Sequence, residues 1–171
     1  EAPNQRQRLD GLKEVLEQLD PEKYMLLIAG KCSDELNEVS KKFEIRNFGY
    51  IKEQGKMNEF FSMADVLLNP SVYETFGLVN IEAMASGTPV VAFDICVMPE
   101  VIGIEGGWIV KELSADALCS CLESLEKDRT EVEEKTETCV ECVREYYDEE
   151  EMLDAFDRLY ETIKKERQNG R

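Results

Sequence analysis

Hydrophobic residues along the first third of the chain follow two alternating patterns. Apolar positions spaced three to four residues apart predict an amphipathic helix over residues 6–19. A continuous apolar run then covers residues 24–29, as expected of a strand buried on both faces of a parallel sheet. Ser33 and the residue after it can cap a second helix that ends near Phe43, and residues 45–48 have the composition of another strand.

The same alternation continues to about residue 128 and predicts an α/β fold with a parallel sheet. The expected elements are helices over residues 56–63, 77–85 and 114–127, and strands over residues 65–69, 89–93 and 108–110.

The two ends of the chain carry expectations of their own. After residue 128 the sequence consists almost entirely of helix formers, which predicts two helices with a break near Tyr147-Asp148. The first expected element is a helix, so we expect a preceding strand either within residues 1–5 or upstream of this chain. Because the chain does not begin with Met, we expect it to be a segment of a longer protein.

Composition and charge exclude several classes of function. The 171 residues are enough for one domain with a substantial core. The net charge of −17 argues against a nucleic-acid partner or an anionic membrane surface, since both require clustered Lys and Arg. No apolar run approaches the ~18–20 residues of a membrane span, so we expect no direct membrane insertion. Residues 112–171 hold 19 of the 37 acidic residues, which favours a solvated helical face over an acidic interaction tail.

The absence of histidine and the placement of cysteine limit the available chemistry. Without histidine the chain lacks the usual general base and the commonest metal ligand. Cys139 and Cys142 have the spacing of a metal-binding pair, but no second pair accompanies them, and structural zinc normally requires four N or S ligands. We therefore expect no metal site, and six reduced thiols without a function in a cytoplasmic protein.

Residues 73–91 carry the candidate chemistry. Two glutamates, Glu74 and Glu82, have seven residues between them. Glu74 lies in an expected loop just before Gly77, whereas Glu82 lies inside an apolar helical run, where a buried carboxylate is costly unless a partner binds it. Open α/β sheets bind ligands beyond the carboxyl ends of their strands, which is where this loop is expected to lie.

The pattern suits a ligand with a diphosphate and hydroxyl groups. A helix N-terminus presents unpaired N–H groups and a partial positive charge to an anion, so a diphosphate matches the N–H groups of Phe76, Gly77 and Leu78. Glu74 can accept hydrogen bonds from a sugar, and Glu82, about 7–8 Å further along the axis, from a ribose diol. Taken singly, Glu74 could be an exposed loop acid and Glu82 a helix residue that points to solvent. Together they predict an anion and polyol site, for which a nucleotide-sugar is a suitable ligand.

A longer set of residues resembles a known family. The resemblance is to the C-terminal, donor-binding domain of retaining GT-B glycosyltransferases, and most of all to family 4 of the "glycosyl transferases group 1". It covers residues 6–128 approximately and implies a Rossmann-like parallel sheet flanked by helices, one half of a GT-B fold. The residues that carry it are Ala64-Asp65, Asn69-Pro70-Ser71, Glu74, Phe76-Gly77-Leu78, residues 82–91 and Pro99-Glu100-Val101.

The resemblance implies a role for each matching position. Glu82 would hold the ribose, and Glu74 would contact the transferred sugar and is the candidate catalytic residue. The backbone of residues 76–78 would hold the sugar and the diphosphate, while Gly49 and Tyr50 would frame the base. The donor would be a UDP-, GDP- or ADP-sugar, from which a hexose is transferred with retention at the anomeric carbon and without a metal or other cofactor.

Two positions depart from the family pattern. The family normally has an Arg and a Lys that neutralise the diphosphate. Arg8 falls nearest the Lys position, with Arg6 as a substitute, whereas the Arg position falls near Pro3. The alternative for Arg8 is a solvated arginine at the start of a helix. Paired glycines normally precede the Pro-Glu-Val segment, where this chain has residues 95–98 instead.

The resemblance also implies a partner. A GT-B enzyme has two Rossmann-like domains with the active cleft between them, so we expect residues 1–171 to form the nucleotide-sugar-binding domain, inactive by itself, without the N-terminal acceptor domain. The helical segment 146–171 would cross back onto that domain. Its aromatic residues would pack there or in their own core; they are Tyr146, Tyr147, Phe156 and Tyr160. The alternative functions are a non-catalytic GT-B-like regulatory or oligomerisation module, or half of a nucleotide-sugar epimerase.

Overall fold

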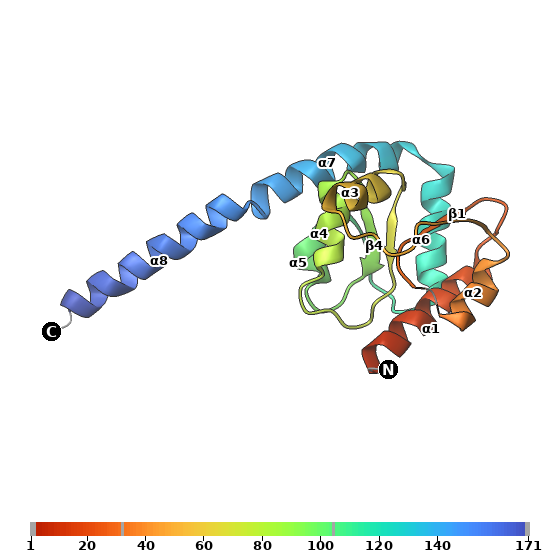
Figure 1. The fold of residues 1–171 in the computed structure, drawn as a ribbon, viewed down its shortest axis with the longest axis horizontal. Coiled ribbons are helices and arrows are strands. Elements are labelled where there is room, and N and C mark those ends of the chain that lie inside the picture. Colours follow the sequence, from red (N-terminus) through yellow and green to blue (C-terminus); the bar gives the residue numbers. More distant parts are fainter. Residues whose placement is uncertain (1–2, 32, 104, 170–171) are drawn as a thin grey trace.

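The computed structural model describes residues 3–31, 33–103 and 105–169, and the side chains within these ranges except those of residues 3–10, 35, 168 and 169. Helices and strands alternate from α1 to α6, and two further helices follow (Figure 1). The elements are α1 Pro3–Gln18, β1 Met25–Ile28, α2 Asp34–Ser40, β2 Glu44–Asn47, α3 Gln54–Ser62, β3 Leu67–Asn69, α4 Leu78–Ala85, β4 Val90–Phe93, α5 Met98–Ile102, β5 Gly107–Val110, α6 Ala115–Lys127, α7 Thr130–Tyr146 and α8 Glu149–Asn169.

The predicted α/β fold with parallel strands and flanking helices is confirmed. Strand β1 pairs in parallel with β2, and β4 lies between β3 and β5, again in parallel. Of the two places expected for a preceding strand, residues 3–5 are excluded because α1 already begins at Pro3, whereas a strand upstream of this chain stays a prediction. The short helix α5 occupies a segment for which the sequence predicted no element.

The strands form two sheets rather than the single sheet that the sequence predicted. In a doubly wound sheet with strands numbered along the chain, the strands lie side by side in the order 3-2-1-4-5-6. In this protein β1 and β2 correspond to strands 2 and 3 of that order. Strands β3, β4 and β5 correspond to strands 4, 5 and 6. The place of strand 1, between β1 and β3, holds no strand among the residues described. The two sheets are therefore not joined by hydrogen bonds at this point.

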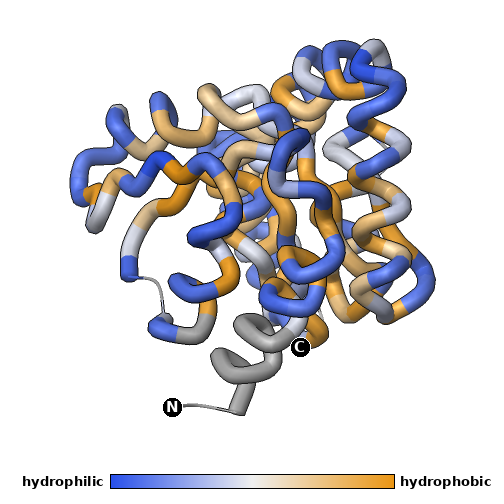
Figure 2. Tube along the Cα trace, turned by 90° about the vertical axis from the view of Figure 1, so that its right-hand side faces the viewer, coloured by the Kyte–Doolittle hydropathy of each residue, from blue (hydrophilic) through white to orange (hydrophobic). Residues whose placement is uncertain are grey.

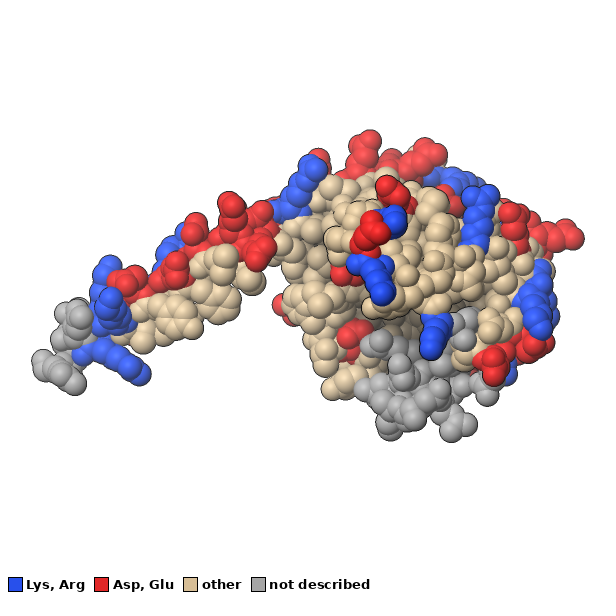
Figure 3. Space-filling view, in the orientation of Figure 1, with Lys and Arg blue, Asp and Glu red and all other residues tan. Residues whose placement is uncertain are grey.

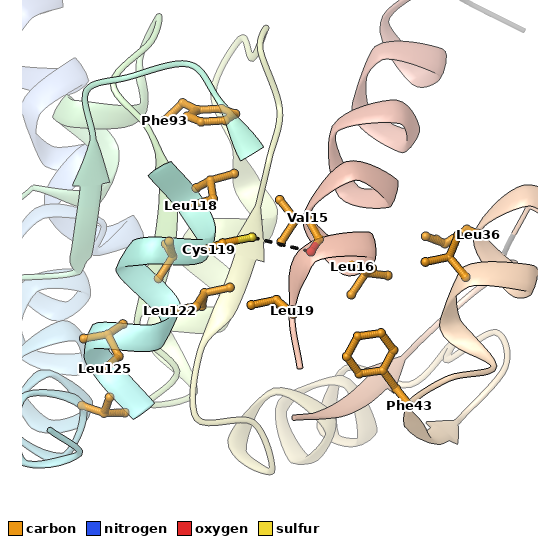
Figure 4. Close-up of a cluster of buried hydrophobic side chains, with 13 residues drawn as sticks. Val15, Leu16, Leu19, Leu36, Phe43, Phe93, Leu118, Cys119, Leu122 and Leu125 are labelled. Atoms are coloured by element: carbon orange, nitrogen blue, oxygen red, sulfur yellow. Dashed lines mark hydrogen bonds between the residues drawn. The ribbon is translucent and has the colours of Figure 1, made fainter. Parts of the chain in front are cut away.

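Both sheets nevertheless share one hydrophobic core. Val15 and Leu16 on α1, and Leu19 directly after it, are buried, as the sequence predicted. Figure 4 shows them between α6 and the side chains of Leu36 and Phe43. Apolar side chains of β1, β2 and β3 pack against this cluster. Helix α1 contacts both α2 and α6, so it spans the two sheets on this side of the molecule.

A second cluster lies on the other face of β4 and is covered by α4, α5 and α7. All four residues of β4 are buried, as expected of a strand covered on both faces. The tube coloured by hydropathy places hydrophobic stretches in the interior and hydrophilic ones in the outer helices and loops (Figure 2). The buried residues of this second cluster are Met84, Val90, Ala92, Met98, Ile102 and Cys139.

Helix α8 extends away from the rest of the molecule (Figure 1). Figure 3 shows charged side chains along one side of this helix and uncharged ones along the other. The large apolar side chains of α8 are between 40% and 66% exposed; they are Met152, Leu153, Phe156, Leu159, Tyr160 and Ile163. Within the described ranges, no helix has the length and apolar character that crossing a bilayer requires.

Candidate functional site

The candidate site is the loop of residues 70–77, which connects the end of β3 to the start of α4. Gly77 is the N-cap of α4 and has a φ of 77°, in the left-handed region that favours glycine. A Cβ atom at this position would lie 2.7 Å from Nδ2 of Asn80 and 3.4 Å from Cγ of Glu74. As a glycine, this N-cap residue makes no side-chain hydrogen bond to the first N–H groups of α4. The start of α4 is therefore a candidate site for an anion.

The two glutamates of the predicted site lie on this loop and this helix. Glu74 is half-buried, and its Oε1 accepts a hydrogen bond from the N–H of Thr75 at 2.9 Å. Glu82 is exposed on α4, because the buried face of this helix consists of Asn80, Ala83 and Met84. The expectation that the apolar run makes the Glu82 carboxylate costly was therefore wrong, and its carboxylate is accessible to a ligand.

Phe76 and Leu78 have exposed side chains on either side of Gly77. The ring of Phe76 contacts the ring of Tyr147 edge to face, with 6.4 Å between the centroids. The hydroxyl of Tyr147 in turn donates a hydrogen bond to the carbonyl oxygen of Val101 at 3.2 Å. Tyr147 thus packs within its own chain and supports the loop, whereas Tyr146 is 69% exposed.

Arg8 lies in α1, and this helix passes beside the start of the loop. A Cβ at Gly11 would lie 3.4 Å from the carbonyl oxygen of Pro70, so the α1 backbone is close to the loop there. Arg8 is three residues earlier, about 4.5 Å along the helix axis. The side chains of Arg8 and Arg6 lie outside the described part of the structure.

Gly49 and Tyr50 lie beyond the carboxyl end of β2, in the other sheet. The carbonyl oxygen of Gly49 accepts a hydrogen bond from the N–H of Gly30 at 2.6 Å, which ties together the loops after β1 and β2. Tyr50 is 79% exposed. The helix that follows this loop, α3, packs against α4, the helix that follows the loop of residues 70–77. The two loops are therefore connected through the contact between these helices.

Tyr50 lines an open hollow of about 420 Å³. The hollow combines two aromatic rings, which offer a stacking surface, with two lysines and two glutamates. Lys56 forms an ion pair with Glu53 at 2.7 Å, so the lining carries no net positive charge. Its lining residues are Phe48, Tyr50, Ile51, Lys52, Glu53, Lys56, Glu59 and Met63.

Two buried asparagines next to the loop are functional candidates that the sequence did not single out as a pair. Asn80 is 0% exposed and Asn69 is 7% exposed, and Nδ2 of Asn69 donates a hydrogen bond to Oδ1 of Asn80 at 2.9 Å. A signal existed in the sequence, because Asn80 interrupts the apolar face of the predicted helix 77–85. Its partner Asn69 is eleven residues away in the sequence, too far for a local pattern to relate the two.

The cysteines do not form a candidate metal centre. Cys139 is buried between α7 and α4, where its Sγ donates a hydrogen bond to the carbonyl oxygen of Met84 at 3.4 Å. Burial raises the pKa of the Cys139 thiol to about 11, which disfavours the thiolate that metals bind. In the described ranges, no group of three or more His, Cys, Asp or Glu residues is arranged to hold a metal ion.

Comparison with known families gives a match over most of the chain. The family model for "Glycosyl transferases group 1" matches residues 4–146. The chain belongs to this family. A phosphatidyl-myo-inositol mannosyltransferase from Mycobacterium leprae is 34% identical over 160 residues, which cover 91% of this chain and 42% of that protein. An alpha-maltose-1-phosphate synthase from Mycobacterium tuberculosis is 49% identical over 57 residues, 32% of this chain and 15% of that protein.

Solved structures confirm the GT-B glycosyltransferase fold. Sucrose-phosphate synthase from Thermosynechococcus elongatus superposes with a TM-score of 0.73 at 24% identity, over 93% of this chain and 43% of that one. TarM from S. aureus, in a complex that includes UDP, superposes with a TM-score of 0.74 at 23% identity, over 93% of this chain and 33% of that one. An Anabaena protein in complex with UDP and glucose superposes with a TM-score of 0.68 at 17% identity, over 94% of this chain and 44% of that one. The chain thus spans less than half the length of these relatives.

Proposed function

We propose that this chain is the nucleotide-sugar-binding half of a retaining glycosyltransferase that transfers a hexosyl group from a UDP-, GDP- or ADP-sugar. The observation that carries the proposal is the N-terminus of α4, whose N-cap residue is the glycine Gly77, between the carboxylates of Glu74 and Glu82. Two proteins of similar fold were solved with UDP, which supports a nucleotide as the ligand of this fold.

The site residues act on different parts of the donor. The N–H groups of Phe76, Gly77 and Leu78 bind the diphosphate and stabilise the negative charge that develops on it as the sugar leaves. Glu74 accepts hydrogen bonds from the transferred sugar, and Glu82 accepts them from the ribose diol. No metal or other cofactor takes part in this proposal.

The remaining predicted residues lie further from the start of α4. The base lies against Gly49 and Tyr50 at the mouth of the hollow after β2. Arg8 supplies positive charge to the diphosphate from α1, whose backbone passes beside Pro70. The first assignment rests on the contact of α3, which follows Tyr50, with α4, and the second on the closeness of α1 to Pro70.

The proposal predicts that a nucleoside diphosphate stabilises the chain and that Glu82→Ala reduces the effect to half or less. A ligand at about 100 times its Kd stabilises the native state by about 2.7 kcal/mol, which a thermal-shift assay with UDP, GDP and ADP detects. A hydrogen bond to a charged group contributes about 1.5–3 kcal/mol, so the variant should bind about 10- to 100-fold more weakly.

Glu141→Ala is the matched control, because Glu141 is an exposed glutamate on α7, away from the loop. It should bind the nucleotide as the unmodified chain does. The proposal fails if none of the three nucleotides stabilises the chain, or if Glu82→Ala and Glu141→Ala bind equally well.

The acceptor half of the enzyme lies, in this proposal, in an N-terminal domain that α8 contacts. The exposed apolar side of α8 supports this, since six large apolar side chains on one helix lack cover within the described part of the chain. Phe156 and Tyr160 belong to this side, as the resemblance implied for the segment that crosses to the other domain. The chain by itself is inactive in this proposal.

The double variant Leu153→Asp/Phe156→Asp tests the role of α8. In the 171-residue chain both side chains are at least half exposed, so its free energy of unfolding should change by less than about 0.5 kcal/mol. In the full-length protein it should fall by about 3 kcal/mol or more, because burying each side chain contributes about 1.5–3 kcal/mol. Asp154→Ala/Glu161→Ala, on the charged side of α8, is the control. Equal stability of the two double variants in the full-length protein would contradict the contact.

A further inference from the structure

We propose that Asn69 and Asn80 are positioning residues that hold the loop of residues 70–77 in its donor-binding shape. The proposal rests on the proposed function of this loop. Both side chains are buried, so neither contacts a ligand that approaches from solvent. They act through the loop, at its two ends.

The hydrogen bonds of the pair fix the orientation of both amides. Oδ1 of Asn69 accepts a hydrogen bond from the N–H of Ser71 at 3.2 Å, so Nδ2 of Asn69 points toward Asn80. Oδ1 of Asn80 accepts that bond, which leaves Nδ2 of Asn80 to donate to Sδ of Met98 at 3.1 Å. One backbone N–H at the start of the loop therefore determines how both side chains are arranged.

Asn80 also supports the far end of the loop. Its backbone N–H donates a hydrogen bond to the carbonyl oxygen of Gly77 at 2.9 Å. Its Nδ2 lies 2.7 Å from the place that a Cβ of Gly77 would occupy, so the amide lies directly against the Gly77 backbone. The Asn69 side chain thus bonds Ser71 at one end of the loop, and the Asn80 side chain packs against Gly77 at the other, with Glu74 and Phe76 between them.

Two apolar side chains of the same branched shape could fill this space without the need for internal hydrogen bonds. Replacing both partners of a buried hydrogen bond by apolar groups is often close to neutral for stability, whereas replacing one leaves the other unsatisfied. Stability alone therefore does not require the hydrogen bond between the two asparagines. A leucine pair cannot accept the hydrogen bond of the Ser71 N–H, and Ser71 is only 2% exposed, so the start of the loop must move for this N–H to find another partner.

The test compares Asn69→Leu, Asn80→Leu and the double variant by thermal unfolding and by titration with UDP, GDP and ADP. Each single variant should lower Tm, and the double variant should recover part of that loss, because no asparagine is then left without its partner whereas the Ser71 N–H still lacks its acceptor. The double variant should nevertheless bind the nucleotide at least tenfold more weakly than the unmodified chain. Thr88→Val is the control, because Thr88 is also 0% exposed and its Oγ1 donates to the carbonyl oxygen of Phe61 at 2.6 Å, beyond the other end of α4. It should lower Tm and leave nucleotide affinity within twofold.

Amide hydrogen exchange in the absence of nucleotide gives a second measurement. The double variant should exchange faster at residues 71–78 and at an unchanged rate in β4. Unchanged loop exchange, or wild-type affinity in the double variant, would overturn the positioning role. If the unmodified chain binds none of the three nucleotides, the proposed function fails, whereas the exchange data still decide whether the pair holds the loop. Should the double variant not fold, Asn69→Leu alone is judged by the same two measurements, since it removes the bond to Ser71.

Discussion

Gly107→Ala is expected to lower the free energy of unfolding by at least about 3 kcal/mol, out of the roughly 5–15 kcal/mol that a domain usually has. Gly107 is paired with Val90 across strands β4 and β5. A Cβ at this position would lie 1.9 Å from the carbonyl oxygen of Val90 and 2.7 Å from its nitrogen. Both are backbone atoms of the central strand, so no side chain can rotate to relieve the overlap. The two strands would have to separate at the start of β5.

Urea denaturation measures this effect, with Gly55→Ala as the matched control. Gly55 lies in α3, and a Cβ there would meet nothing within 4 Å. Alanine is favoured over glycine in helices by up to about 1 kcal/mol, so this variant should be as stable as the unmodified chain or slightly more stable. If the Gly107→Ala chain unfolded at the same urea concentration as the Gly55→Ala chain, strands β4 and β5 would not be as close as the structure places them.

Most of the secondary structure could be predicted because its apolar spacing is regular. Helix α1 and strand β4 are examples, since their buried residues are those that the pattern selects. Helix α5 was missed because it has only five residues and begins beside Pro99, too short a segment for a helical period to be visible. Proline in a first helical turn is nevertheless a common start signal, and it could have indicated this helix.

The division into two sheets could not be predicted in this way. Apolar spacing identifies a strand but not its neighbour, and the pairing of β1 with β2 and of β3 with β4 depends on crossovers through α2 and α4. The strand expected upstream of α1 stays a prediction, and it would occupy the position between β1 and β3. Among the described residues, no strand pairs with β1 or β3 on the side that faces this position.

Local sequence signals were enough to choose the loop before α4 as the candidate site. They did not reveal which of its side chains are exposed or which are paired. Gly77 was found because a loop, a glycine and a helix start coincide, and the structure places the start of α4 within one residue of the prediction. The exposure of Glu82 depends on which face of α4 meets α3 and α7, and the apolar run did not reveal that face. The Asn69–Asn80 pair depends on a contact between β3 and α4, which no local pattern contains.

Gly77→Ala is expected to abolish nucleotide binding and to lower the free energy of unfolding by about 2–4 kcal/mol. The left-handed backbone contributes about 1–2 kcal/mol of this loss, because an L side chain disfavours it. The rest, about 1–2 kcal/mol, comes from the overlap of the new Cβ with Nδ2 of Asn80. Asn80 cannot move away without losing its hydrogen bonds to Asn69 and Met98, so the loop moves instead.

Gly87→Ala separates these two causes, because Gly87 follows the other end of the same helix. Its φ is 80°, close to that of Gly77, but a Cβ there would make only ordinary contacts, the nearest at 3.5 Å from Cγ2 of Thr136. This variant should lose about 1–2 kcal/mol of stability and bind the nucleotide as the unmodified chain does. Calorimetric titration of both variants distinguishes the outcomes. Loss of binding in both would mean that binding follows general stability, whereas loss in Gly77→Ala alone assigns the anion site to the start of α4.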